Sequence, residues 1–245
     1  MSERAAKPLG RKAYGSIPHL PDSRIGPGEH HIHEGQARIC TERPRDRHDR
    51  VIVTEKLDGA NVAVANIDGE LHALGRQGYP AHTAPYEHIR MFGEWVHGQP
   101  GRFLDMLEPG EVLHGEWMAL AHGTRYELAS GDEFIAFDLT RDGKRVVWDE
   151  AVERCGRFGV ATPVTLSDGP PASVEAMLHR LDEVGRPTVD GEDREGAVWR
   201  VERRGGCDFL AKFVRASKVD GAYLPEISGE AAIWLWRPEH RAVGA

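Results

Sequence analysis

The chain has 245 residues, of which 40% are hydrophobic and 29% are charged, and its formal net charge is −8. This length allows one large domain or two small ones with a sizeable core. The three cysteines have no metal-type spacing and leave one unpaired, so a disulfide scaffold is excluded. No run of roughly 20 apolar residues is present, which excludes a membrane span. Together with the lack of a signal-peptide pattern, these features favour a cytoplasmic protein.

Residues 1–50 are rich in glycine, proline, histidine and charge, and we predict an N-terminal extension that packs on or beside the core. His30, His31 and His33 suggest a metal site, but neighbouring residues rarely converge on one ion and no cysteine lies at ligand spacing. We therefore expect a solvated or hydrogen-bonded loop there. The mixed-charge segment 42–50 is a second expected loop, which could contact a nucleic-acid phosphate or only keep the next strand soluble.

Two runs of β-forming residues surround a lysine in the stretch 51–65. Residues 51–54 are all β-branched, and Val62 and Val64 recur at period 2, which predicts two strands. The Asp-Gly pair at 58–59 predicts a turn, so Lys56 is expected at the end of a strand just before the chain reverses. A lysine held in a pocket loses hydration, and its pKa falls toward use as a nucleophile. The plain alternative is a surface lysine beside a hairpin.

The remaining elements follow from turn signals and periodicity. Asp-Gly pairs at 68–69 and 142–143 predict turns, the first of them a hairpin that joins strands at 60–66 and 70–75. Arg76 follows this hairpin, and it either lies over the same pocket as Lys56 or belongs to a turn. Apolar periodicity predicts helices at 86–97, at 150–156 with Asp149 as cap, after Ser173, and at 231–236 before Pro238. Further strands are predicted at 111–118, 132–139, 196–202 and 208–214.

Five short patterns then occur in a fixed order along the chain. They are Lys56-Leu57-Asp58-Gly59, His114-Gly115-Glu116-Trp117, the segment 134–139 (FIAFDL), the segment 195–200 (EGAVWR) and the segment 210–213 (LAKF). They resemble motifs I, III, IIIa, IV and V of the covalent nucleotidyltransferases, which include ATP-dependent DNA ligases, RNA ligases and mRNA capping enzymes. Glu55 before the lysine and Asn61 five positions after it are typical of the RNA ligase branch.

The resemblance implies an α+β fold, the ATP-grasp-like adenylation domain of ligases, in which antiparallel sheets flanked by helices surround a nucleotide pocket. It places this nucleotidyltransferase domain at residues 51–225, with a short C-terminal helix or tail at 226–245. Only about 30 residues follow the last motif, which is too few for the OB-fold of DNA ligases and capping enzymes. An unidentified protein partner could take the place of that domain.

The activity implied by the resemblance is ATP-dependent RNA ligation in three phosphoryl-transfer steps. The lysine attacks ATP to form a lysyl-AMP, AMP moves to the 5′-phosphate of an RNA, and a 3′-hydroxyl displaces AMP and seals the strand. Such chemistry uses Mg²⁺ or Mn²⁺, and the protein must mainly align the reactants and stabilise phosphate charge. The net acidity of the chain counts against general nucleic-acid binding, although a local positive pocket can coexist with acidic surface.

The resemblance also assigns roles to individual residues. Lys56 matches the nucleophile, and Lys212 matches the cation that neutralises the α-phosphate and the pyrophosphate. Glu195 matches the carboxylate that engages the divalent metal, and Glu116 matches the acceptor for the ribose. Phe137 matches the aromatic ring that stacks on the purine, with core packing as its alternative and Phe134 as a competing candidate.

Other motif residues have two readings. Glu55 is expected to orient the strand end near the adenine or the lysine. Asn61 could donate to a phosphate oxygen or only continue the turn, and Asp58 could hold the lysine or only make the turn. Arg76 matches an arginine that reaches the nucleotide or the nucleic-acid end. All of these are pocket residues only if the fold brings the motifs together.

One departure from the family pattern is visible in motif V. Many relatives have Lys-x-Lys, whereas this chain has Lys212 followed by Phe213, Val214 and Arg215. The second cation is displaced by one residue, which moves it to the other face of a strand. We therefore expect Lys212 in the pocket and do not expect Arg215 to replace the second lysine there.

Three rival functions stay open. A capping-type guanylyltransferase also uses Lys-x-Asp-Gly, but the absence of OB-fold sequence and the presence of Glu55 and Asn61 disfavour it. A DNA nick ligase is not excluded. A non-catalytic nucleotide- or RNA-binding module is disfavoured because it would have no need of the lysine nucleophile.

Overall fold

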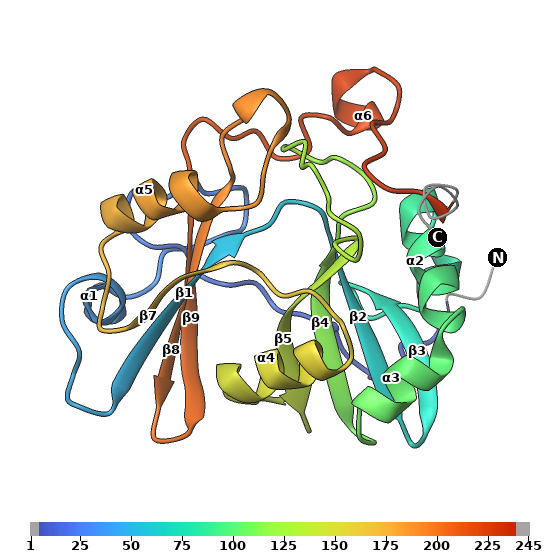
Figure 1. Cartoon of the computed structure of the whole chain (residues 1–245), viewed down its shortest axis with the longest axis horizontal. Helices are drawn as coiled ribbons and strands as arrows, with labels where there is room; N and C mark the ends of the chain where they lie inside the picture. The colour runs from blue at the N-terminus through green and yellow to red at the C-terminus, as the bar shows by residue number, and fades with distance from the viewer. Residues whose placement is uncertain (1–4, 239–245) are drawn as a thin grey trace.

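A computed structural model describes residues 5–238, and it shows two antiparallel sheets side by side with helices on their flanks (Figure 1). The ends of the predicted extension and of the predicted tail, residues 1–4 and 239–245, lie outside this range. The first sheet has the order β7-β1-β8-β9, and the second has the order β3-β2-β4-β5-β6. The strands are β1 (Asp49–Lys56), β2 (Ala60–Ile67), β3 (Glu70–Gly75), β4 (Glu111–Trp117), β5 (Phe134–Arg141), β6 (Lys144–Arg145), β7 (Thr165–Gly169), β8 (Gly196–Arg203) and β9 (Gly206–Val214).

The tight hairpins have the backbone that their residues favour. Asp68 and Gly69 join β2 to β3 with φ values of 53° and 88°, and residues 142–143 and 204–205 also have positive φ between paired strands. Two successive residues at positive φ make the two-residue turn whose twist matches that of the flanking strands. The predicted Asp-Gly turns at 68–69 and 142–143 are therefore confirmed.

The link between β1 and β2 differs from the prediction. The two strands do not form a hairpin, because β1 pairs with β7 and β8 while β2 pairs with β3 and β4. The segment 57–59 therefore crosses from one sheet to the other. Gly59 is needed there for close approach rather than for positive φ, since a Cβ atom would lie 2.7 Å from the carbonyl oxygen of Trp117. This crossing leaves Lys56 facing the space between the sheets.

Helices cover the outer sides of both sheets. The predicted helices are present as α2 (Glu87–His97), α4 (Trp148–Arg157) and α5 (Val174–Val184). Ser173 caps α5 as predicted, by accepting a hydrogen bond from the Ala176 amide, whereas residue 147 occupies the cap position of α4 instead of Asp149. The sequence interpretation missed α1 (Glu34–Thr41), α3 (Pro100–Met106) and the short α6 (Pro225–Ser228).

Each sheet has its own hydrophobic core. The second sheet packs against α2, α3 and α4 through an aromatic cluster that includes Phe92, Trp95, Phe103, Trp117 and Phe134. The first sheet packs against α1 and α5 through a separate cluster of buried side chains. The faces that the two sheets turn toward each other stay partly open, and this arrangement creates the cavity described below.

The predicted helix at 231–236 is wrong, because this segment is extended. Its backbone pairs with residues 119–121 through hydrogen bonds from Leu235 to the Ala119 oxygen and from Ala121 to the Ile233 oxygen, each 2.9 Å long. Trp236 also packs against Trp117, with 5.3 Å between ring centroids. These tertiary contacts outweigh the weak local helix propensity of a six-residue stretch.

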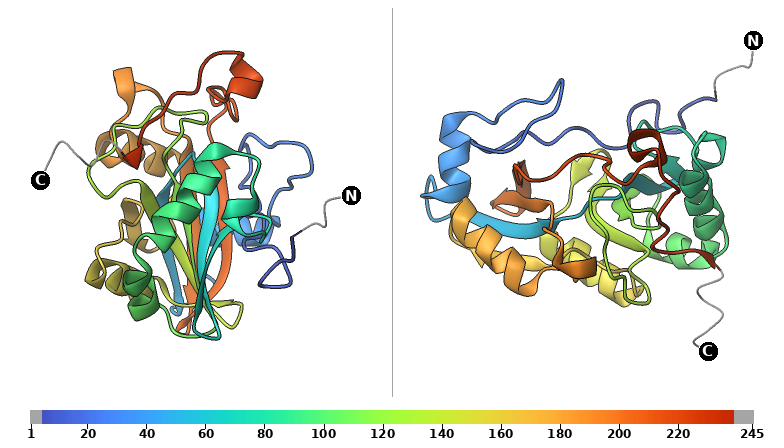
Figure 2. Two further views of the ribbon diagram at one scale, coloured as in Figure 1. Left: turned by 90° about the vertical axis from the view of Figure 1, so that its right-hand side faces the viewer. Right: turned by 90° about the horizontal axis from the view of Figure 1, so that it is seen from above.

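The N-terminal segment is built into the fold rather than appended to it. Seen from above, it runs along one side of both sheets (Figure 2). Lys212 of β9 pairs with this segment, through its amide to the Pro18 oxygen and through its oxygen to the Leu20 amide. Leu20 and Ile32 are buried in the core of the first sheet. Residues 18–24 therefore continue the first sheet beyond β9.

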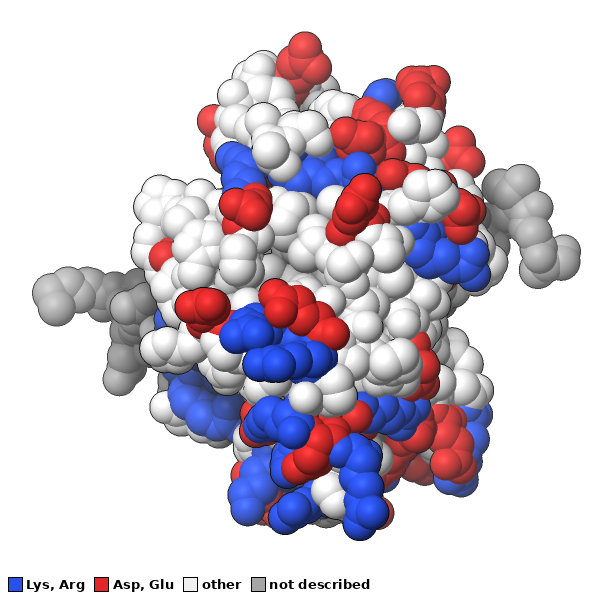
Figure 3. Space-filling model, turned by 90° about the vertical axis from the view of Figure 1, so that its left-hand side faces the viewer, with Lys and Arg blue, Asp and Glu red and all other residues white. Residues whose placement is uncertain are grey.

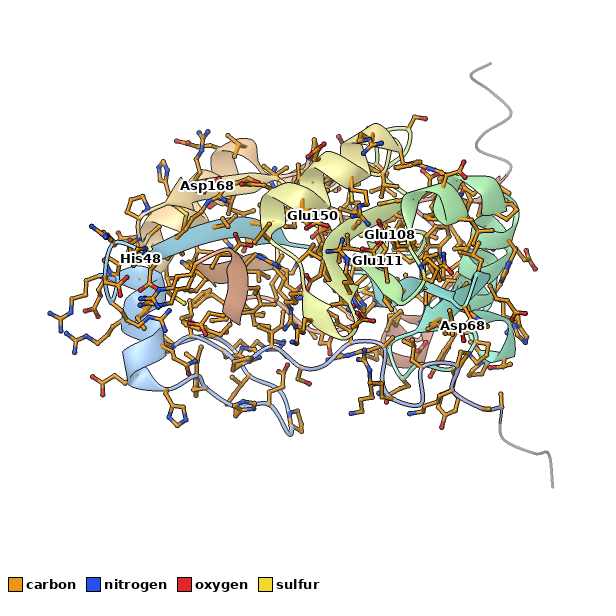
Figure 4. The ribbon with its side chains drawn as sticks, turned by 90° about the horizontal axis from the view of Figure 1, so that it is seen from below. His48, Asp68, Glu108, Glu111, Glu150 and Asp168 are labelled. Carbon is orange, nitrogen blue, oxygen red and sulfur yellow. The ribbon has the colours of Figure 1, made fainter. Side chains whose placement is uncertain are left out.

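A buried ion cluster fixes α4 beneath the second sheet. Glu111 of β4 is fully buried and pairs with Arg141 of β5 and Arg154 of α4. Arg154 and Arg141 also pair with Glu150, so one cluster joins two strands to a helix. Figure 4 shows Glu111 and Glu150 on the underside of the molecule. We assign this cluster to stability because its carboxylates are already satisfied by arginines.

Candidate active site

The two sheets and the N-terminal segment enclose a cavity of about 490 Å³. This volume lies within the range of about 300–1,000 Å³ that is common for small-molecule sites. Every residue assigned to the site from the sequence motifs lines it: Glu55, Lys56, Asn61, Arg76, Glu116, Phe137, Glu195 and Lys212. Residues that are far apart in the chain thus converge on one cavity, as the motif order predicts.

The first sheet supplies side chains to the cavity by simple alternation along each strand. Lys56 of β1 lies opposite Gly196 of β8, and Gly196 lies opposite Val214 of β9. Two residues further along β8, Val198 lies opposite Lys212 of β9. Because side chains two residues apart share a face, Lys56, Lys212 and Val214 all point into the cavity.

Lys56 is held by the motif IV carboxylate. Its Nζ lies 2.5 Å from Oε2 of Glu195, and it also donates to the Leu57 carbonyl oxygen at 3.3 Å. Burial acts to lower the pKa of Lys56, but the nearby charges of Glu195, Glu116 and Asp58 outweigh burial and raise this pKa above its usual value. The expectation of a lowered lysine pKa is therefore wrong for the protein without substrate, because the carboxylates stabilise the ammonium.

Two further carboxylates are positioned by backbone amides. Glu116 accepts a hydrogen bond from the Gly59 amide at 3.1 Å, and Asp58 accepts one from the Gly123 amide at 2.8 Å. Asp58 is buried and its carboxylate points toward the loop after β4, which fixes the crossing between the sheets. Burial raises the pKa of Glu116 to about 7 and acts to raise that of Glu195 as well, while the adjacent ammonium of Lys56 favours the ionised form of both carboxylates.

The donor set of the cavity suits a divalent cation. Glu116 and Glu195 offer carboxylate oxygens, and the buried Oδ1 of Asn61 has no hydrogen-bond partner among the described residues. Over residues 5–238, no group of three or more His, Cys, Asp or Glu side chains forms a complete metal cage. Such a cation is commonly held by one or two carboxylates together with substrate phosphates and water, so a partial cage suits it.

Glu55 has a different environment from the one expected. Its carboxylate accepts hydrogen bonds from the amides of Val164 at 2.9 Å and Arg186 at 3.0 Å, and it forms a buried ion pair with the Arg186 guanidinium. Arg186 also pairs with Asp132 at 3.2 Å. These contacts anchor the end of β1, directly before Lys56, to two loops. A direct contact between Glu55 and a nucleotide stays a prediction.

The two phenylalanines of motif IIIa face opposite sides of β5. Phe134 is 1% exposed and packs in the aromatic core, so the structure removes it as the stacking candidate. Phe137 lines the cavity, and its ring packs edge-on against Tyr14 with 5.1 Å between centroids. Tyr14 in turn donates a hydrogen bond to Asp138 at 3.0 Å. The N-terminal segment thus supports the ring that is predicted to stack on the base.

A buried ionic network forms the floor of the cavity and joins the two sheets. Arg200 of β8 reaches Asp138 of β5 at 3.1 Å and Glu202 at 2.7 Å, and Arg145 pairs with the same Asp138 at 2.6 Å. Glu202 also accepts a hydrogen bond from the Trp148 amide. Asp138 lies within motif IIIa, so the motif could have indicated it. Arg200 ends the motif IV segment 195–200, so that motif could have indicated it, but no local pattern shows that its side chain faces the cavity.

The N-terminal segment contributes cavity residues that the sequence interpretation missed. Glu29 pairs with the Nζ of Lys212 at 2.6 Å and with Nε2 of His19 at 3.1 Å. The other ring nitrogen of His19 lies 2.7 Å from Oγ of Ser23. Arg24 also lines the cavity. No sequence motif marks these residues, because the segment is irregular and reaches the site only through its pairing with β9.

Other candidates lie away from the cavity. Arg215 faces α5, where it pairs with Asp182 at 2.7 Å, so it does not take the place of a second motif V lysine. His31 is hydrogen-bonded to the Leu20 oxygen and forms a β-bridge with His19, so this member of the histidine cluster is hydrogen-bonded as expected. At the lower end of the molecule in Figure 3, Lys and Arg side chains are interleaved with acidic ones. Ion pairs among the strands of the first sheet and the loop that precedes β1 include Arg45–Asp208, Arg203–Asp49 and Arg50–Asp168.

Comparisons with known proteins indicate the family and the fold of the chain. The sequence profile described as RNA ligase matches residues 49–214, whereas no curated protein gives a significant match. Among solved structures, the chain is similar to a Naegleria gruberi RNA ligase variant with ATP and Mn (17% identity, TM-score 0.54, 83% of this chain and 58% of that one). It is also similar to a putative ATP-dependent DNA ligase from Aquifex aeolicus (18% identity, TM-score 0.51, 82% of this chain and 49% of that one). A third similar structure is an archaeal ATP-dependent RNA ligase (21% identity, TM-score 0.46, 68% of this chain and 43% of that one).

The chain thus spans between 43% and 58% of the length of these three structures, and at such identities the likeness concerns the fold alone. Among residues 5–238, no helix has the length and apolarity needed to cross a bilayer. The sequence profile, in contrast, covers more than half of the chain, including all five motifs. On that match, the chain belongs to the RNA ligase family.

Proposed function

We propose that this protein is an ATP-dependent RNA ligase that works through a lysyl-AMP intermediate. Lys56 attacks the α-phosphorus of ATP and expels pyrophosphate, AMP is transferred to the 5′-phosphate of an RNA, and a 3′-hydroxyl displaces AMP to close the strand. The observation that carries the proposal is the convergence of Lys56, Glu195, Glu116 and Lys212 on one cavity between the two sheets. A binding module would need no partly buried lysine paired with a carboxylate at 2.5 Å.

The proposal requires Lys56 to lose its proton before it attacks. In the free protein the carboxylates around it stabilise the ammonium. Glu195 and Glu116 would hold a divalent cation, and with their charges neutralised in this way burial would lower the pKa of Lys56. The resting ion pair therefore keeps the lysine inert until nucleotide and metal are both bound. The cation would also screen the charge of the phosphate oxygens.

The remaining cavity residues suit the nucleotide and its phosphates. The Phe137 ring, supported by Tyr14, offers a stacking face, and Glu116 can accept from a ribose hydroxyl. Lys212 lies two strands from Lys56 on the same face of the sheet, where it can contact the α-phosphate. These roles rest on geometry and on the family resemblance together.

A second groove leads away from the cavity and suits the RNA end. It shares Asn61, Arg76 and His122 with the cavity, and Tyr79 and Tyr86 are among the residues along its wall. Tyr86 is 54% exposed, so its ring is open to a base. Aromatic rings on which successive bases stack are the usual device for holding single-stranded nucleic acid. We propose that the RNA end enters along this groove and meets the adenylate at Arg76.

The test is a two-stage labelling experiment. The protein is incubated with ATP or GTP labelled on the α-phosphate together with Mg²⁺ or Mn²⁺, denatured, and examined for covalent label. The proposal predicts an acid-labile adduct with ATP that is absent in Lys56→Ala and present in Lys144→Ala, an exposed lysine of the β5–β6 hairpin. The labelled protein is then offered 5′-phosphorylated RNA, and the label should move to the RNA.

The other outcomes separate the rival functions. An adduct that forms only with GTP would indicate a capping-type enzyme. An adduct with ATP that transfers to nicked DNA but not to RNA would indicate a DNA ligase. No adduct with either nucleotide under any metal would leave a nucleotide- or RNA-binding module as the better description.

A further inference from the structure

The cavity contains five cationic side chains, and their partners differ. Three are already paired with carboxylates: Lys56 with Glu195, Lys212 with Glu29, and Arg200 with Asp138 and Glu202. The side chains of the other two, Arg24 and Arg76, make no hydrogen bond or ion pair with any residue in the described range 5–238, although Arg76 interacts electrostatically with Glu116. Both are exposed at the rim. Arg76 lies within the profile match at 49–214, whereas Arg24 lies outside it.

The position of Arg24 is fixed by the main chain. Its amide donates to the Val214 oxygen at 3.0 Å, and the hydroxyl of the preceding Ser23 accepts from the Val214 amide at 2.9 Å. Val214 is the position, two residues after Lys212, at which this chain lacks a second cation. The amide and the carbonyl oxygen of Val214 are therefore both hydrogen-bonded to Ser23 and Arg24. This contact places an arginine beside the position at which the strand itself has no cation.

Register across the sheet relates Arg24 to the proposed nucleophile. Lys56, Gly196 and Val214 lie opposite one another on β1, β8 and β9, and Arg24 follows beyond β9. At about 4.8 Å per strand, the Cα atoms of Lys56 and Arg24 are roughly 14 Å apart. Between them, Gly196 has no side chain and Val214 points into the cavity. Two long cationic side chains that both line the cavity can thus approach a phosphate chain from its two ends.

We propose that Arg24 binds the β- and γ-phosphates of the nucleotide and stabilises the departing pyrophosphate. In phosphoryl transfer the attacking and leaving groups lie roughly in line through the phosphorus. Lys56 enters this line from β1 and Arg24 enters it from beyond β9. A guanidinium makes paired hydrogen bonds to phosphate oxygens, and Arg24 has no competing carboxylate partner to give up. This inference rests on the proposed adenylation and adds a residue to it.

The test compares two nucleotides that differ only in the phosphates at issue. Binding of AMP and of α,β-methylene-ATP, which cannot be cleaved by Lys56, is measured by titration calorimetry with the full chain. The wild type should bind the triphosphate analogue more tightly than AMP. Arg24→Ala should weaken the analogue about tenfold, with AMP affinity within twofold, and Arg24→Lys should retain most of the difference. Arg43→Ala, an exposed arginine that does not line the cavity, is the charge-matched control.

A second variant tests the substitution directly. Val214→Lys in the Arg24→Ala background should restore the preference for the triphosphate analogue, because it returns a cation to the same row of the sheet. Equal weakening of AMP and analogue in Arg24→Ala, or no weakening of either, would overturn the role of Arg24. A wild-type protein that binds neither nucleotide would overturn the proposed function itself, so the two failures are distinguishable.

Discussion

Glu29 holds Lys212 in the free protein, and its replacement by glutamine gives a prediction with a calculable size. The carboxylate pairs with Lys212 at 2.6 Å and with His19 at 3.1 Å, and it accepts from the Gly26 amide at 2.7 Å. Burial acts to raise the pKa of Glu29, but hydrogen bonds from Lys212, Gly26 and His19 outweigh burial and lower the pKa from 4.5 to about 2. The ionised carboxylate is thus stabilised by the fold.

The magnitude follows from this shift. At 1.36 kcal/mol per pKa unit, the lowering of the Glu29 pKa from 4.5 to about 2 corresponds to about 3.4 kcal/mol. The Glu29 side chain is 29% exposed, so solvent screening reduces the contribution to about 1–2 kcal/mol. Glu29→Gln should therefore lower the free energy of unfolding at pH 7 by about 1–2 kcal/mol. The same change should strengthen binding of α,β-methylene-ATP several-fold, because Lys212 is released and a negative charge is removed beside the phosphates.

The pH dependence has a definite sign. A carboxylate with a lowered pKa in the folded state contributes stability above its unfolded pKa of about 4.5, and this contribution is lost as pH falls toward 2. The difference in unfolding free energy between wild type and Glu29→Gln should thus be present at pH 7 and shrink below pH 4.5. Urea unfolding followed by tryptophan fluorescence measures it. A variant that is as stable as the wild type at pH 7, or that binds the analogue more weakly, would refute the reasoning.

Three further variants test the cavity. Phe137→Ala should weaken ATP binding by about 1–3 kcal/mol in a titration, whereas Phe134→Ala should instead lower the free energy of unfolding by about 3–5 kcal/mol; the reverse pattern would exchange their roles. Burial raises the pKa of Glu116 to about 7, so its ionisation destabilises the fold as pH rises from 4.5 through 7. Glu116→Gln should therefore raise the unfolding temperature relative to wild type at pH 8.5 and not at pH 5. Gly196→Ala should destabilise the protein and abolish adduct formation, because its Cβ would clash with the Phe213 carbonyl oxygen and displace Glu195; unchanged stability would contradict this.

Local signals predicted most strands and several helices because those signals depend on near neighbours. The alternation along 196–202 and the Asp-Gly turn at 68–69 each depend on a few neighbouring residues. The cap of α5 joins Ser173 to the amide three residues later. The pairing of β1 and β2 with different sheets depends on contacts far along the chain. The turn at 58–59 carries the same residues in either topology, so the sequence could not show that the chain crosses between sheets there.

The motif residues of the site were predictable, and their environments were not. Family resemblance brought Lys56 and Glu195 to one site, and alternation excluded Arg215 from it. The pKa of Lys56 is raised by carboxylates from three separate segments of the chain, and no local sequence pattern predicts their combined electrostatic effect. Arg24 and Glu29 come from an irregular segment without periodicity, and only the pairing of that segment with β9 brings them to the cavity.

The resting state suggested by these contacts is one in which each reactive cation already has an internal anion. Lys56 is paired with Glu195 and Lys212 with Glu29, so the negative charges of the nucleotide have to compete with carboxylates. Such pairing keeps these partly buried charges satisfied in the absence of substrate, since a lysine withdrawn from water without a partner would destabilise the fold. It also makes nucleotide affinity depend on the N-terminal segment, which contributes Glu29 and Arg24.

The central claim is that the Nζ of Lys56 becomes covalently bonded to AMP. Intact-mass spectrometry after incubation with ATP and Mn²⁺, followed by peptide mapping, tests this most directly. We predict a mass increase of a single adenylyl group on the peptide that contains Lys56, reversed by added pyrophosphate. An unmodified protein under these conditions, or an adenylyl group on any other residue, would contradict the account.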